Sequence, residues 1–196
     1  MASEQKPRAR QSARDMILSL AVLLVIIGAT VWLTRGCQFS PNGPTIDPSS
    51  LPTVDANREL SGAARRVDFP VRAPAVPAGW RSNSSNTVPI GTGADATTAV
   101  RVGWITSGGN YLRLSQSKAA ADALVVMEAG GGISPDTKGT VDVADTKWTK
   151  YPGRGTELSW VTSLAGTQVL ITGNGTPDEF QTLAQATQTA QPLPTT

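Results

Sequence analysis

The sequence of 196 residues contains no histidine and a single cysteine, Cys37. Without histidine, the chain can form neither a Ser-His-Asp triad nor an imidazole ligand to a metal. A single cysteine excludes an intrachain disulfide and a cysteine-rich zinc site. These absences remove the commonest catalytic base and the commonest metal ligands, so we expect no cofactor and no bound metal.

The excess of positive over negative charge is also small. The chain has 17 basic and 15 acidic residues, and its net charge of +2 is too small to indicate a nucleic-acid-binding surface. Residues 1–15 hold four of the basic and two of the acidic residues, whereas the chain from Arg35 onward holds 13 of each. The positive excess therefore lies at the N-terminus, and we expect no nucleic-acid partner.

A long apolar run follows the basic N-terminal segment. Residues 16–34 form 19 consecutive residues without a charge, bracketed by Asp15 and Arg35. A helix of this length rises about 28 Å, close to the roughly 30 Å hydrocarbon core of a bilayer. Because the basic residues are concentrated before the run, the pattern predicts a transmembrane helix with a cytoplasmic N-terminus. We therefore expect the lipid bilayer as a partner through residues 16–34.

Three other interpretations compete with a retained anchor. A cleaved signal peptide has a shorter apolar stretch and a small-residue cleavage site, which this segment lacks. A lipoprotein would be cleaved before Cys37, although Arg35 fits the residues preceding such a cysteine poorly. A buried core helix would be shorter or amphipathic. The retained anchor is the preferred interpretation, and the lipoprotein is its main alternative.

The segment after the apolar run has the composition of a stalk. Four prolines and many small polar residues lie between Gln38 and Ala56, and such a stretch buries too little apolar surface to fold. A short helix at 57–66, with Leu60 on its apolar side, is the alternative to a continued linker. Cys37 is either an inert or acylated thiol or, in an oxidising compartment, the link of a homodimer.

Patterned sequence extends from about residue 67 to residue 190. Alternating apolar and polar residues predict a hairpin over 98–106 and 111–115, with a glycine-rich turn between the strands. The same alternation predicts further strands at 141–144, 147–151, 156–162 and 167–172. The polar, low-complexity segment 81–97 is typical of a surface loop.

Two helices are predicted among these strands. The first follows Ser117 as N-cap and ends at Gly130. Its sheet-facing stripe comprises Ala121, Leu124, Val125 and, at the end, Glu128. The second begins with a capping box formed by Thr176 and Glu179, with Pro177 between them. Its apolar stripe comprises Phe180, Leu183, Ala184 and Thr187.

These elements define the expected organisation. The fold class is α+β, with an N-terminal transmembrane helix followed by an antiparallel sheet domain that has helices mainly on one face. The expected boundaries are 1–15 for a cytoplasmic tail, 16–34 for the transmembrane helix, 35–66 for an extracytoplasmic linker, 67–190 for the α+β domain and 191–196 for a C-terminal tail.

Few side chains of this domain are suited to catalysis. The candidate carboxylates are Asp95, Asp142, Asp145 and Glu157. Their spacing indicates no acid–base pair, because Asp142 and Glu157 fall on outward strand positions and Asp95 lies in a predicted loop. Ser115 and Lys118 match the S-x-x-K motif by letter, but they flank a strand-to-helix junction. We therefore assign no catalytic, cofactor-binding or metal-binding residue.

Large aromatic side chains are few, and four of them are tryptophans of the patterned region. These are Trp80, Trp104, Trp148 and Trp160. If exposed, they would stack on the sugars of a glycan partner. Their strand phase matches that of neighbouring valines and leucines, which favours a place in the core.

An ordered series of motifs runs along the chain. The apolar run is followed by "FPV" and "GW", then by "VRVGWITSGGNYLRLSQS" at 100–117 and "ITGNGTPDEFQTLAQA" at 171–186. In this order they resemble a family of actinobacterial single-span envelope proteins catalogued as domain of unknown function 4245, over most of the chain. The resemblance implies an inner-membrane protein that faces the cell wall. It implies no activity and no catalytic residues.

Three functions are consistent with these observations. The preferred one is a membrane-anchored, non-catalytic envelope module that binds a protein or a wall component. The alternatives are an envelope hydrolase that uses carboxylates or the Ser115–Lys118 pair, and a lipid- or ligand-carrying domain with an apolar cavity. The expected location is the cytoplasmic membrane, with the N-terminus inside and the C-terminal domain outside the cytoplasm.

Overall fold

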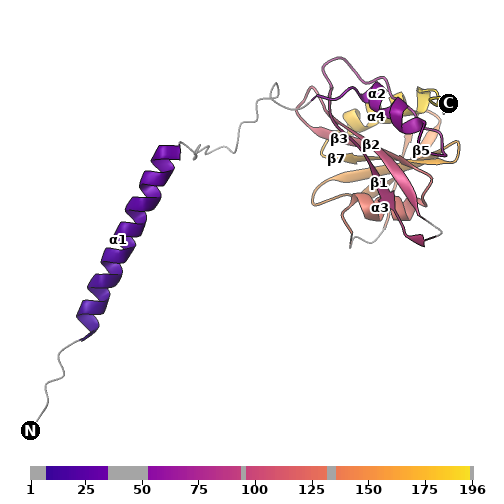
Figure 1. Cartoon of the computed structure of the whole chain (residues 1–196). Coiled ribbons are helices and arrows are strands. Elements are labelled where there is room, and N and C mark those ends of the chain that lie inside the picture. The colour runs from indigo at the N-terminus through magenta and orange to yellow at the C-terminus, as the bar shows by residue number, and fades with distance from the viewer. Residues whose placement is uncertain (1–7, 35–52, 94–95, 132–135, 195–196) are drawn as a thin grey trace, which may run out of the picture. The chain divides into compact units, whose positions relative to one another are not determined.

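The structure is a computed structural model that describes residues 8–34, 53–93, 96–131 and 136–194 (Figure 1). The chain divides into two compact units, Met1–Ser50 and Leu51–Thr196, each of which is described here by itself. Cys37, most of the predicted stalk and Asp95 lie outside the described residues.

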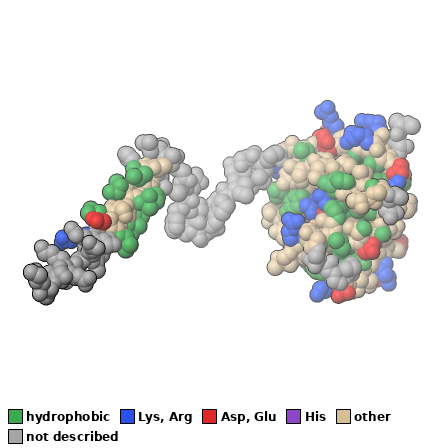
Figure 2. Space-filling model, turned by 60° about the horizontal axis from the view of Figure 1, so that its bottom comes forward, with side chains coloured by type: hydrophobic (Ala, Val, Ile, Leu, Met, Phe, Trp, Pro, Cys, Tyr) green, Lys and Arg blue, Asp and Glu red, His purple; other side chains and the backbone are tan. Residues whose placement is uncertain are grey.

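The first unit contains one helix, α1 (Arg8–Thr34), of 27 residues. Ten of its large apolar side chains, from Met16 to Ile27, are each 50 to 70% exposed, and Figure 2 shows apolar side chains along this helix. Among the described residues, no helix is both long and apolar enough to cross a membrane. The predicted transmembrane helix at 16–34 thus lacks support from the structure, and the side chains of residues 31–34 lie outside the described part.

The second unit is built on a single antiparallel sheet of seven strands in the order β1-β2-β3-β7-β6-β5-β4. The strands are β1 (Arg81–Ile90), β2 (Thr97–Ile105), β3 (Tyr111–Ser117), β4 (Thr140–Val143), β5 (Thr146–Pro152), β6 (Leu158–Leu164) and β7 (Thr167–Gly173). Strand β7 lies between β3 and β6, so it joins the N-terminal meander to the C-terminal one. The expected α+β class with an antiparallel sheet is confirmed.

Three helices cover the sheet, and two of them share a face (Figure 1). Helices α2 (Ala56–Ala64) and α4 (Pro177–Thr189) pack on one face, where the larger apolar cluster lies. Helix α3 (Ala121–Glu128) packs on the opposite face, over a smaller apolar cluster that includes Leu124, Val125 and Leu170. We call these surfaces the α2/α4 face and the α3 face.

The α2/α4 face holds the tryptophans. Trp104, Trp148 and Trp160 are at most 4% exposed and belong to one cluster of buried side chains, against which the half-buried Trp80 packs. The ring of Trp160 lies 5.0 Å from that of Phe180 on α4. The assignment of Trp104, Trp148 and Trp160 to the core is confirmed, so these three rings are not available to stack on a glycan.

The local signals for two helices are also confirmed. At α4, Thr176 accepts a hydrogen bond from the backbone of Glu179, the Glu179 side chain accepts one from the backbone of Thr176, and all four residues of the apolar stripe are buried. At α2, Leu60 is buried in the core. The folded unit therefore begins before residue 67, and Leu193 beyond its predicted end packs on the same core.

Two local predictions are wrong. Residues 81–90, expected as part of a loop, form edge strand β1. Most of its side chains are polar and only Ile90 is buried, so the strand lacks the alternation of apolar and polar residues that would have predicted it. Ser117 does not cap α3: it ends β3, where its hydroxyl donates to the Thr98 carbonyl, and α3 begins at Ala121 without a side-chain cap.

Candidate functional site

An unusual polar cluster lies under α3, and the helical spacing of that element accounts for it. Leu124, Val125 and Glu128 form one stripe, because residues three and four apart share a helix face. The first two pack on the sheet, so Glu128 is carried to the sheet as well. Its side chain is 0% exposed. The fold therefore places a carboxylate where a helix normally places an apolar side chain.

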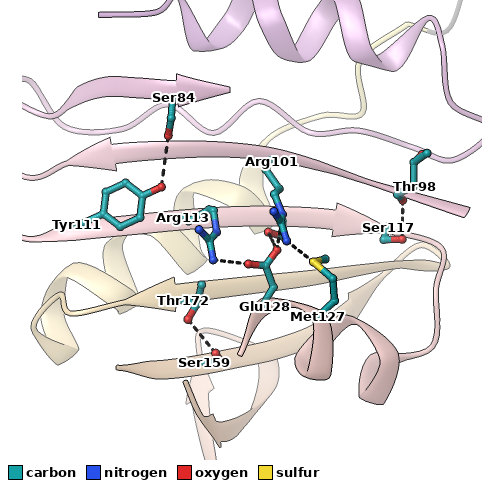
Figure 3. Close-up of polar contacts among 11 residues, drawn as sticks. Ser84, Thr98, Arg101, Tyr111, Arg113, Ser117, Met127, Glu128, Ser159 and Thr172 are labelled. Atoms are coloured by element: carbon teal, nitrogen blue, oxygen red, sulfur yellow. Dashed lines mark hydrogen bonds and ion pairs between the residues drawn. The ribbon is translucent and has the colours of Figure 1, made fainter. Parts of the chain in front are cut away.

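Strands β2 and β3 supply the partners of this carboxylate (Figure 3). The Nε of Arg101 donates to Glu128 Oε1 at 2.7 Å, and the Ser115 hydroxyl donates to the same oxygen at 2.5 Å. The Nη2 of Arg113 donates to Oε2. Arg101 and Ser115 are paired across the two strands, and Arg113 follows two residues away on the same face. Strand pairing thus converges three donors on one buried acceptor.

This arrangement determines what Glu128 can do chemically. Three donors bind its two oxygens and its side chain is 0% exposed, so a substrate does not reach the carboxylate where it lies under α3. A buried ion pair contributes little net stability, but breaking it leaves a costly uncompensated charge. The cluster therefore fixes α3 on the sheet and provides no general base.

Positive charge exceeds negative charge in this region. Arg101 and Arg113 share the single carboxylate of Glu128, and their side chains are only 14% and 26% exposed. The side chain of Arg154 lies against Gly130, just after α3, so closely that a Cβ there would be 2.6 Å from its Nη2. The three ion pairs that the structure describes do not include Arg154.

A group of hydroxyls continues the polar surface beyond Arg113. The hydroxyls of Tyr111 on β3 and Ser84 on β1 lie 3.3 Å apart across β2 (Figure 3). They meet above Gly103, where a Cβ would overlap both oxygens. Glycine is therefore required at this point of β2 for the tyrosine to reach the edge strand.

The structure does not bring Ser115 and Lys118 together. Ser115 is fully buried and donates to Glu128, whereas the exposed Lys118 forms an ion pair with Asp68. The hydrogen bond from Lys118 holds the pKa of Asp68 below its ordinary value of 3.8. Each member of the candidate dyad is engaged by a different partner, so neither activates the other.

The candidate carboxylates are also separate from the cluster under α3. Asp142 and Asp145 are exposed at β4 and the turn that follows it, and Glu157 is half-buried before β6. Within the described ranges, no three acidic or cysteine side chains come close enough to hold a metal ion.

Three pockets lined by described residues each contain one charged side chain, which is Lys118, Asp68 or Lys147. No acid–base pair forms in any of these three pockets.

Comparison with known proteins identifies a family. The family model described as protein of unknown function (DUF4245) matches residues 8–187. The chain belongs to this family. The match confirms the resemblance seen in the sequence, and it includes α1 as well as the folded unit up to the last turn of α4. No curated protein and no solved structure matches the chain.

Sequence reasoning missed the arginines of the cluster. Arg101 and Arg113 occupy the polar positions of a hairpin with clear alternation, where charged side chains normally face water. The available signal was Glu128, a carboxylate at the end of a helix stripe that is otherwise apolar. A charge on a buried stripe calls for a partner on the facing sheet, and only β2 and β3 place arginines opposite it.

Proposed function

We propose that this member of the DUF4245 family is a membrane-anchored, non-catalytic module of the cell envelope, whose folded unit binds a protein or a wall component outside the cytoplasm. The anchoring is supported by the apolar surface of α1, where ten large apolar side chains between Met16 and Ile27 are exposed. In the folded unit as described, Leu158 is the one large apolar side chain that is exposed, and at 40% it is less exposed than any of these ten. A helix that is apolar on all sides requires an apolar surrounding.

Two further observations support the proposal. The family match begins at residue 8 and includes α1, which supports treating this helix as part of the family's sequence pattern. The Ser115–Lys118 pair considered for catalysis is engaged by other partners, since Ser115 donates to Glu128 and Lys118 bonds to Asp68. A binding role fits this arrangement better than hydrolysis does.

Membrane extraction tests the anchor. The full chain is expressed in bacterial cells, and isolated membranes are washed with alkaline carbonate, which releases peripheral proteins. We expect the wild-type chain to stay in the membrane and a Leu20→Arg, Leu24→Arg variant to be released, because a charge in the hydrocarbon core costs several kcal/mol, about 2.5–3.5 each. The matched control is Leu158→Arg, which should remain in the membrane. Release of the wild-type chain by carbonate would overturn the anchor.

The single cysteine allows a direct test of orientation. A membrane-impermeant maleimide added to intact cells should label Cys37 in the wild-type chain. The Ser3→Cys, Cys37→Ser variant moves the thiol to the other side of the apolar run and should be labelled only after permeabilisation. The opposite labelling pattern would place the folded unit in the cytoplasm.

A further inference from the structure

We propose that the α3 face carries a binding site for one oxyanion group, a phosphate or a carboxylate, formed by Arg113 with the hydroxyls of Tyr111 and Ser84. This inference rests on the proposed binding role of the folded unit and names the chemistry that it recognises. The argument begins with charge. Two arginines under α3 share a single carboxylate, and Arg154 lies against Gly130 at the end of the same helix.

Among the described ion pairs, Glu128 is the one carboxylate that Arg101 and Arg113 share, and Arg154, which is exposed, is in none of them. Arg101 and Arg113 are largely removed from water, and a buried charge is stable only when it is paired. An anion from outside the chain would complete the charge balance of the cluster.

Arg113 is the member of the cluster that can accept such an anion. Its Nη2 bonds to Glu128, its Nε is buried without a partner among the described residues, and 26% of the side chain is exposed. A guanidinium group offers five N–H donors in a plane, and two of them can bind the two oxygens of one oxyanion. Because Nε is buried and Nη2 bonds to Glu128, Nη1 is the donor that we assign to the ligand.

The hydroxyls beside Arg113 suit the same ligand. Tyr111 stands two residues from Arg113 on the same face of β3, and its oxygen lies 3.3 Å from that of Ser84 (Figure 3). Both groups are half-buried, and Ser84 also donates to Asn83 Oδ1 at 3.3 Å, so each O–H would turn from a partner within the chain toward an anionic oxygen. Guanidinium donors and hydroxyl donors on one surface select an oxyanion over a cation or an apolar ligand.

Titration with inorganic phosphate tests the site. The full chain in a neutral detergent is titrated with potassium phosphate, and potassium chloride at equal ionic strength is the reference. We expect a saturable rise in the thermal unfolding midpoint with phosphate only, because a ligand that binds the folded state stabilises it. Arg113→Gln should weaken the apparent affinity about tenfold or more, and Tyr111→Phe about threefold.

The control variant is Arg58→Gln, which removes an exposed arginine from α2 and should leave the phosphate response unchanged. Far-ultraviolet circular dichroism in chloride shows whether each variant is folded. If Arg113→Gln is unfolded, the Tyr111→Phe and Ser84→Ala variants carry the test, because neither contacts Glu128. An equal response in Arg58→Gln and in the site variants, or no saturable response to phosphate or acetate, would overturn the proposal.

Two further arms distinguish the source of the oxyanion. Acetate replaces phosphate to detect a carboxylate site. The phosphate titration is repeated in nanodiscs of phosphatidylglycerol and in nanodiscs of phosphatidylcholine. If the site takes a lipid headgroup, phosphatidylglycerol competes with phosphate, and a higher phosphate concentration is needed than in phosphatidylcholine. Equal titrations in the two lipids identify a soluble ligand. Membrane extraction is read separately, so failure of the anion site would leave the anchoring proposal standing.

Discussion

The α2/α4 face of the sheet is apolar, whereas the α3 face combines a small apolar cluster with arginines, hydroxyls and a buried glutamate. On the first face, tryptophans from β2, β5 and β6 pack with Phe180 and Leu60 from two helices. On the second, an eight-residue helix covers part of the sheet and ends on Glu128. Burial of apolar surface is the main source of stability, at about 25 cal/mol per Å². The first face therefore holds the fold together, and the second carries polar groups in place of part of an apolar core.

The largest effect should come from the apolar face. Phe180→Ala removes a fully buried ring from α4 and its contact with Trp160, and it should lower the free energy of unfolding by about 3–5 kcal/mol. Urea denaturation monitored by tryptophan fluorescence measures this loss. A cost below about 1 kcal/mol would show that the α2/α4 face is not the main source of stability.

A smaller but clear effect is expected on the α3 face. Glu128→Gln keeps the shape of the side chain and removes the charge that Arg101 and Arg113 share, which should cost about 2–4 kcal/mol in urea denaturation. The matched control is Glu59→Gln on α2, an exposed glutamate whose replacement should change the stability by less than about 0.5 kcal/mol. Equal effects of the two substitutions would mean that the buried cluster does not hold α3.

The N-terminus of α4 should make the α2/α4 face sensitive to acid. Burial raises the pKa of Glu179, but hydrogen bonds from Thr106, the Thr176 backbone and Asn110 outweigh it and hold the pKa below its ordinary value of 4.5. The stabilisation is present above that value and is lost as the pH falls through the lower pKa of the folded state. In Glu179→Gln, the thermal unfolding midpoint should therefore fall less steeply as the pH is lowered than in the wild-type chain. The free energy of unfolding at neutral pH should change by no more than about 1 kcal/mol.

The smallest effect is expected at Lys118, which belongs to neither packed face. Its ion pair with Asp68 is exposed to solvent, and such pairs contribute little because water screens the charges. Lys118→Gln should leave the thermal unfolding midpoint unchanged, whereas Ser115→Ala, which deletes a donor to buried Glu128, should lower it. A large loss in Lys118→Gln would require a buried role for the lysine that its exposure does not suggest.

The same two faces separate what sequence reasoning predicted from what it missed. The valines, leucines and tryptophans of the α2/α4 face alternate with polar residues, so their strands and burial followed from period-two patterning. The capping box of α4 and the apolar stripe of α2 could also be predicted, because the residues that form each signal lie within a few positions of one another in the sequence. Strand β1 was missed because its side chains are small and polar and it borders only one neighbour.

The sequence by itself determined the class of fold, most element positions and the family, since hydrophobic periodicity and capping are local properties of the chain. Only the tertiary structure decided that Glu128 is buried and that Arg101, Arg113 and Ser115 surround it. Tertiary structure also placed β7 between β3 and β6, and it gave Ser115 and Lys118 different partners, Glu128 and Asp68. The physical reason is that a charge on an alternating strand satisfies the same local pattern in water or under a helix, and only the packing of α3 distinguishes the two.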